Sequence, residues 1–80
     1  MSADEMLKEL GYEVATEKYA VEEDCIIYKN ESGNSLYFSL KEKAVAAYTE
    51  EMKYMSNKMA LLEMVELVAI TEKCKELGWL

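Results

Sequence analysis

A strand-turn pattern in the middle of the chain restricts the possible folds more than any other feature. Ser35–Leu40 alternates strictly, with Leu36, Phe38 and Leu40 on one face and Ser and Tyr side chains on the other. Such alternation is typical of a strand with one buried face. Asn30–Asn34, directly before it, contains the Asn and Gly residues that tolerate the positive φ of hairpin turns. The centre of the chain therefore predicts an antiparallel hairpin.

Neighbouring segments extend this hairpin into a meander. Cys25–Lys29 is rich in β-branched and aromatic residues, which favours a strand. Tyr12–Val21 alternates loosely, and Glu22–Asp24 after it reads as a charged turn. On the other side, Lys41–Lys43 predicts a turn and Ala44–Thr49 a weaker fourth strand. Short connections between consecutive strands predict a three- or four-stranded antiparallel sheet.

The N-terminal segment has the pattern of a short helix. Ser2 and Glu5 are spaced as a capping box, in which each side chain accepts a hydrogen bond from a free amide of the first turn. Gly11 ends the pattern. One apolar stripe is expected to face the core, made of Ala3, Met6, Leu7 and Leu10.

A longer helix is predicted at the C-terminal end, over Lys58–Leu77. Ser56 or Asn57 would cap it, since both residue types are preferred at a helix N-cap. Residues 50–57 are then a connection, although the spacing of their Met residues also allows one long helix that begins near Glu50.

The two predicted helices end alike, on Lys-Glu-Leu-Gly followed by an aromatic residue. Gly11 and Gly78 are expected to adopt the left-handed conformation, and Tyr12 and Trp79 to fold back on the preceding turn. Convergent capping explains the likeness better than an internal repeat, because nothing else aligns around it.

The C-terminal helix is more apolar than a surface helix needs to be. One stripe is expected to pack on the sheet: Ala60, Met64, Leu67, Ile70, Cys74 and Leu77. A second apolar flank consists of Leu61, Val65 and Val68, with Met59 nearby. Either the first helix or residues 50–57 cover this flank, or it is exposed and forms a surface for a partner or a homodimer.

Charge and residue types exclude several classes of function. The 80 residues include 9 Lys and Arg against 16 Asp and Glu, a net charge of −7 that opposes direct nucleic-acid binding. No His is present, and the chain has no phosphate-binding loop, nucleophile motif or metal-ligand spacing. We therefore expect no catalytic residues, no metal and no cofactor, and a protein that is not an enzyme.

Cysteine content and hydropathy indicate the cellular compartment of the protein. Cys25 and Cys74 are too few for a disulfide framework and are expected to be free thiols of a cytoplasmic protein. Met59–Ile70 is the longest apolar stretch, but two Glu residues interrupt it and it is too short to cross a bilayer. The N-terminal residues are acidic, unlike a signal peptide. No membrane association is expected.

The ends and the central turn together resemble a group of small uncharacterised proteins found among phage and prophage genes of Gram-positive bacteria. The likeness lies in Ser2–Leu7, Leu10–Tyr12, the Tyr28–Asn34 turn and Lys75–Leu80. It spans nearly the whole chain except the Met-rich residues 50–57. The resemblance implies a cytosolic accessory protein and carries over no catalytic residues.

Taken together, these patterns predict a single α+β domain over residues 1–80. A short N-terminal helix, an antiparallel meander and a long C-terminal helix are expected, with both helices on one face of the sheet. The favoured function is a small non-catalytic protein–protein interaction module, for which a homodimer is one form. The alternatives are an acidic inhibitor or nucleic-acid mimic directed at a basic protein, and a small ligand binder or enzyme.

Overall fold

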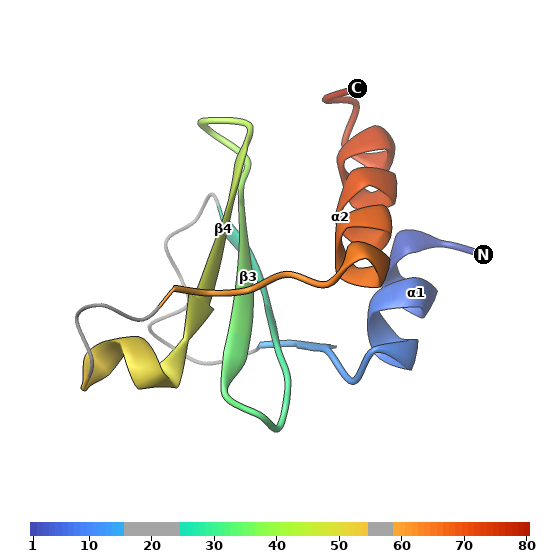
Figure 1. Ribbon diagram of the computed structural model, residues 1–80. Helices are drawn as coiled ribbons and strands as arrows, with labels where there is room; N and C mark the ends of the chain where they lie inside the picture. The colour runs from blue at the N-terminus through green and yellow to red at the C-terminus, as the bar shows by residue number, and fades with distance from the viewer. Residues whose placement is uncertain (16–24, 55–58) are drawn as a thin grey trace.

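The computed structural model of the chain describes residues 1–15, 25–54 and 59–80. One antiparallel sheet carries both α-helices on the same side (Figure 1). The elements in chain order are α1 (Ala3–Glu9), β1 (Glu13–Val14), β2 (Cys25–Lys29), β3 (Asn34–Ser39), β4 (Ala44–Thr49), the 3₁₀ helix η1 (Glu50–Lys53) and α2 (Met64–Glu76). The fold is α+β, as the sequence predicts.

The sheet is a simple meander, in which the strands are hydrogen-bonded in the order β1-β2-β3-β4. Tyr28 lies opposite Leu36, and Leu36 lies opposite Ala47, so these three form one row across the sheet. Side chains alternate between the faces, and this row faces the helices. The neighbouring row, which contains Ile27 and Tyr37, faces away from them.

The core lies between the sheet and the two helices. Phe38, Leu36 and Leu7 are fully buried, and the rings of Phe38 and Tyr28 pack edge to face with their centroids 5.6 Å apart. Leu40 was predicted to share the buried face of β3 but is exposed, because the strand ends at Ser39 and Leu40 begins the turn.

Two predicted segments lie largely outside the described residues. Of Tyr12–Val21, the structure describes Tyr12–Ala15, in which β1 is shorter than the alternation predicts. The predicted turn at Glu22–Asp24 lies wholly outside the described residues.

Helix α1 begins and ends as predicted. The Ser2 hydroxyl accepts a hydrogen bond from the Glu5 amide, and the Glu5 carboxylate accepts one from the Ser2 amide. At the other end Gly11 has a φ of 90°, and the Tyr12 amide donates to the Leu7 carbonyl at 3.0 Å. These bonds form a Schellman cap, which lets the chain reverse into β1.

Helix α2 ends as predicted but begins later. Gly78 has a φ of 79° and the Trp79 amide donates to the Cys74 carbonyl at 2.9 Å, the same cap as in α1. The predicted start at Lys58 is wrong, because residues 59–63 are not helical and the N-cap is Glu63. Ser56, Asn57 and Lys58 lie outside the described residues.

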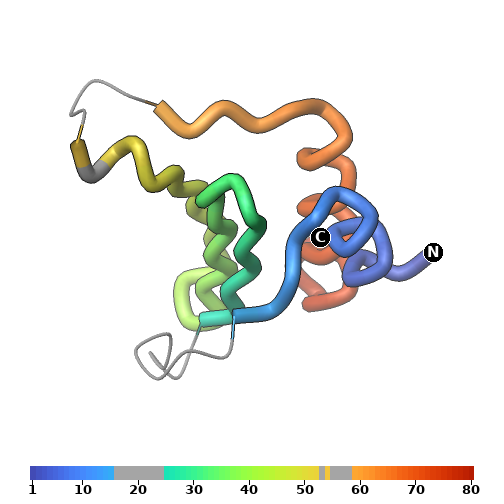
Figure 2. Tube along the Cα trace, turned by 90° about the horizontal axis from the view of Figure 1, so that it is seen from below, coloured from blue at the N-terminus to red at the C-terminus, as the bar shows by residue number. Residues whose placement is uncertain are grey.

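The alternative of one long helix from near Glu50 is also wrong. The 3₁₀ helix η1 follows directly on β4 and ends at Lys53. Residues 59–63 then run as an extended strap from the η1 side of the sheet to the helix side (Figures 1 and 2). Ala60–Leu62 of the strap lie beside Ala47 and Tyr48 of β4. The strap therefore passes close to the end of β4 before α2 begins.

The buried face of α2 is rotated from the predicted stripe. Ile70 is buried as expected, and Cys74 and Leu77 pack against the core. Met64 and Leu67 instead point outward, with Met64 74% exposed. Ala69, which lies outside the predicted stripe, is fully buried.

Candidate interaction surface

A polar cluster at the junction of α1, β2 and α2 fixes the rotation of α2. The Tyr28 hydroxyl donates to Asp4 Oδ1 at 2.6 Å, and Lys73 Nζ lies 3.2 Å from the same oxygen. The Lys73 ammonium also stands 5.8 Å from the centre of the Tyr28 ring, within cation–π range. One residue from each of three elements therefore meets in a single cluster.

The pKa values of this cluster favour the charged pair and the neutral phenol. Hydrogen bonding from Tyr28 lowers the pKa of the Asp4 carboxyl. Burial, and then the bond to Asp4, raise the pKa of Tyr28. Burial acts to lower the pKa of Lys73, but its bonds to Tyr28 and Asp4 outweigh burial and raise it. None of these groups is poised to exchange a proton near neutral pH, so the cluster has the properties of a structural contact.

Glu66 joins the beginning of α2 to the end of α1. Its Oε1 accepts a hydrogen bond from the Glu63 amide at 3.0 Å, and its Oε2 accepts one from the Tyr12 hydroxyl at 2.6 Å. Burial, followed by the bond to Glu66, raises the pKa of Tyr12. One carboxylate thus satisfies a free amide at the helix N-terminus and holds the aromatic residue of the α1 cap.

A third contact completes the antiparallel docking of the two helices. The Ala3 amide at the start of α1 donates to Glu76 Oε2 at 2.7 Å, at the end of α2. Asp4 contacts Lys73, and Tyr12 contacts Glu66. The contacts therefore pair the start of α1 with the end of α2, and the end of α1 with the start of α2. The residues of α2 that make none of these contacts lie on a side that faces away from α1.

That outward side carries a group of exposed large apolar side chains, which we term the apolar surface. Its members are the five that are more than half exposed, Met59 (75% exposed), Leu61 (83%), Met64 (74%), Val65 (54%) and Val68 (54%), whereas Leu67 beside them is 39% exposed. Four of the five were identified from the sequence as a candidate interface: Met59, Leu61, Val65 and Val68. Met64 was missed because it was assigned to the buried stripe. The rotation of α2 about its axis depends on the polar partners of Glu66 and Lys73. These partners come from distant segments of the chain, so the sequence of the helix alone does not predict the rotation.

One interpretation of the sequence proposed that the first helix or residues 50–57 cover the apolar surface, and among the described residues neither α1 nor residues 50–54 do so. Helix α1 docks on α2 through Glu76 and Lys73, and Val65 and Val68 each remain 54% exposed. Of residues 50–57, the described part is η1 and Tyr54, and Tyr54 is itself 85% exposed. A set of apolar side chains within ten residues of sequence therefore faces solvent.

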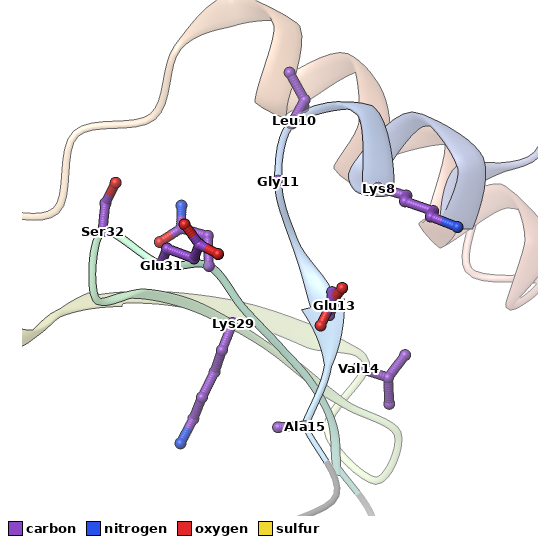
Figure 3. A pocket seen from close by; sticks show the side chains of 10 residues that line it. Lys8, Leu10, Gly11, Glu13, Val14, Ala15, Lys29, Glu31 and Ser32 are labelled. Atoms are coloured by element: carbon purple, nitrogen blue, oxygen red, sulfur yellow. The ribbon is translucent and has the colours of Figure 1, made fainter.

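A depression lies elsewhere in the described part of the chain, between the end of α1 and the turn that joins β2 and β3. It has a volume of about 800 Å³, and Lys8, Glu13, Lys29 and Glu31 are among its lining residues. Figure 3 shows that the side chains of Lys8 and Lys29 point in different directions and do not converge on one point. A small-molecule site needs convergent polar groups, so this depression lacks the geometry of one.

Within residues 1–15, 25–54 and 59–80, no three His, Cys, Asp or Glu side chains are grouped closely enough to hold a metal ion. Cys25 and Cys74 are free and partly buried. Cys74 packs against the core, whereas Cys25 shares the sheet face of Ile27, which points away from the helices.

Comparisons with known proteins return no relative: no family model matches the chain, and neither the curated proteins nor the solved structures include a match. Among the described residues, neither α-helix has the length and apolar character that crossing a bilayer requires. The candidate site therefore rests on the geometry of the apolar surface.

Proposed function

We propose that the protein is a small, non-catalytic interaction module of the cytoplasm that binds a protein partner through the apolar surface. The observation that carries this proposal is the exposure of five large apolar side chains on α2 and the strap before it. Exposed apolar patches of this kind mark interaction sites. Met59 and Met64 add flexible, polarizable side chains that adapt to a partner.

The proposal includes two kinds of partner, another protein or a second copy of this chain. A homodimer through Leu61, Val65 and Val68 would bury the same patch on both copies. The net charge of −7 supports a second candidate function, an acidic inhibitor of a basic protein. An origin among phage or prophage genes belongs to the proposal as well, on the strength of the sequence resemblance.

Site-specific photo-cross-linking tests the function directly. A photoreactive phenylalanine analogue replaces Val65 on the apolar surface, and a matched protein carries it at Lys8, an exposed position on α1. Both are expressed in the cells from which the gene comes and irradiated, and the products are identified by mass spectrometry. We expect a discrete product from position 65 that is absent from position 8.

The mass of the product distinguishes the two partners. A product of twice the chain mass identifies a second copy, and any other discrete mass identifies a different protein. Equal products from both positions, or none from position 65, would contradict the proposed function.

A further inference from the structure

The charges next to the apolar surface are mostly of one sign. From Met59 to Ile70 the chain contains two Glu residues and no Lys or Arg, and of the two Glu residues Glu66 is held by Tyr12 whereas Glu63 is exposed. Glu63, which is exposed, lies between Leu61 and Met64 on the side of the strap. One turn beyond Val68, Glu72 borders the other side and lies 3.9 Å from Lys75. Carboxylates therefore flank the apolar surface at both ends along the chain.

A second copy of the chain is a poor match for this arrangement. A twofold contact centred between Met64 and Val65 brings the Glu63 residues of the two copies to within about one helical turn of each other. Like charges placed together at an interface oppose association. Each copy also carries the net charge of −7, which adds repulsion at longer range.

We propose that the natural occupant of the apolar surface is a cationic amphipathic helix of another protein. This inference rests on the proposed function and adds the chemistry of the partner. The partner's apolar residues cover Val65, Val68 and Met64, while Lys or Arg residues on both borders of its apolar face meet Glu63 and Glu72. Recognition by apolar anchors with charged borders is a common mode of helix binding.

The extent of the surface also limits the geometry of the contact. The exposed apolar residues of α2 span only Met64–Val68, and Thr71, Glu72 and Lys75 follow on the outward side. This length is little more than one helical turn. The partner helix therefore crosses α2 at an angle near its N-terminal end and also contacts Leu61 of the strap.

Two synthetic peptides test the inference. Both are amphipathic helices with the same leucine face, and they differ only in carrying Lys or Glu on the borders of that face. Binding to the full chain is measured by fluorescence anisotropy at low salt, and the site is mapped by amide chemical shifts. We expect the Lys peptide to bind about tenfold tighter than the Glu peptide, with shifts concentrated in residues 59–72.

Charge-neutral variants separate specific docking from general attraction to an acidic protein. V65S/V68S leaves the net charge unchanged and should abolish binding of the Lys peptide. Glu63→Gln should weaken that binding about two- to fivefold, as expected for a border charge pair. Glu9→Gln, which makes the same charge change on an exposed position of α1, should have no effect beyond the general attraction.

Each other outcome overturns the inference. Equal binding of both peptides would show a surface without charge preference, and equal binding to V65S/V68S would show attraction to net charge alone. Absence of binding by either peptide, or self-association through the apolar surface, would exclude a cationic helix as the occupant. The photo-cross-link from position 65 is independent of these peptides, so the proposed function can survive the failure of this inference.

Discussion

At the scale of single residues, Glu66 is the side chain that most directly connects the helices. Its two oxygens accept bonds from the Glu63 amide and the Tyr12 hydroxyl. Glu66→Gln removes the charge from both bonds and should lower the free energy of unfolding by about 1 to 2 kcal/mol. Chemical denaturation monitored by circular dichroism measures the change.

Two further variants make this prediction specific. Glu72→Gln makes the same charge change at an ion pair of 3.9 Å on the helix surface and should cost less than about 0.5 kcal/mol. Tyr12→Phe combined with Glu66→Gln should show a coupling energy of about 1 kcal/mol. Equal costs at positions 66 and 72, or additive effects at 12 and 66, would contradict the role assigned to Glu66.

At the scale of whole elements, the caps of the helices give the clearest prediction. Gly78 has a φ of 79°, and a Cβ atom at this position would meet nothing within 4 Å. The cost of a side chain is therefore one of backbone conformation. Gly78→Val should lower the free energy of unfolding by about 1 to 2 kcal/mol, because β-branched residues resist positive φ. Gly78→Asn should lower the free energy of unfolding clearly less. Thermal unfolding measures both variants, and equal destabilisation by Val and Asn would contradict the role of the left-handed conformation at Gly78.

The elements also show which structural features local sequence can predict. The meander and both glycine caps were predictable, because alternation, turn residues and a Gly after an amphipathic run act over a few residues. The start of α2 was not, since Glu63 is a poor N-cap by residue type while Ser56 and Asn57 are good ones. Glu66, held by Tyr12 54 positions earlier in the chain, supports the helix where local preference does not.

The candidate site divides in the same way. The excess of apolar residues in 59–70 is a property of sequence alone, and it pointed to Met59, Leu61, Val65 and Val68. The exact outward face depends on the rotation of α2, which is set by the contact of Lys73 with Asp4 of α1 and by the contact of Glu66 with Tyr12. Met64 was consequently placed on the wrong side.

At the scale of the whole molecule, stability in acid depends on the contact between α1 and the rest of the fold. Asp4 has a lowered pKa in the folded state, first because Tyr28 donates to it. The contribution of Asp4 to the free energy of unfolding is therefore present above its pKa in the unfolded chain, about 3.9. It is lost as the pH falls through the lower pKa of Asp4 in the folded protein. Asp4→Asn should be less stable than the wild type at neutral pH, and urea unfolding near pH 3 should show a smaller difference. A difference that does not change with pH would contradict this assignment.

The same docking limits stability in alkali, with the opposite sign. Burial raises the pKa of both Tyr12 and Tyr28 in the folded state, and their bonds to Glu66 and Asp4 raise it further. Their contribution is therefore complete below the unfolded pKa of about 10 and is lost as the pH rises toward the folded values. As the pH is raised, we expect one part of the phenolate absorbance to appear only at the pH at which the protein unfolds. Tyr12→Phe and Tyr28→Phe should each remove a share of that part.

Both phenylalanine variants should be less stable than the wild type at pH 7, because each leaves a carboxylate without its phenol donor. This difference in stability should shrink above about pH 10. There the ionisation of a tyrosine that the variants lack lowers the free energy of the unfolded wild type and so reduces the stability of its folded state. Tyr54→Phe is the matched control, since Tyr54 is 85% exposed and its replacement should leave the stability at pH 7 unchanged. If all three variants behave alike, the hydroxyls of Tyr12 and Tyr28 do not hold α1, α2 and β2 together, and the rotation of α2 must have another cause.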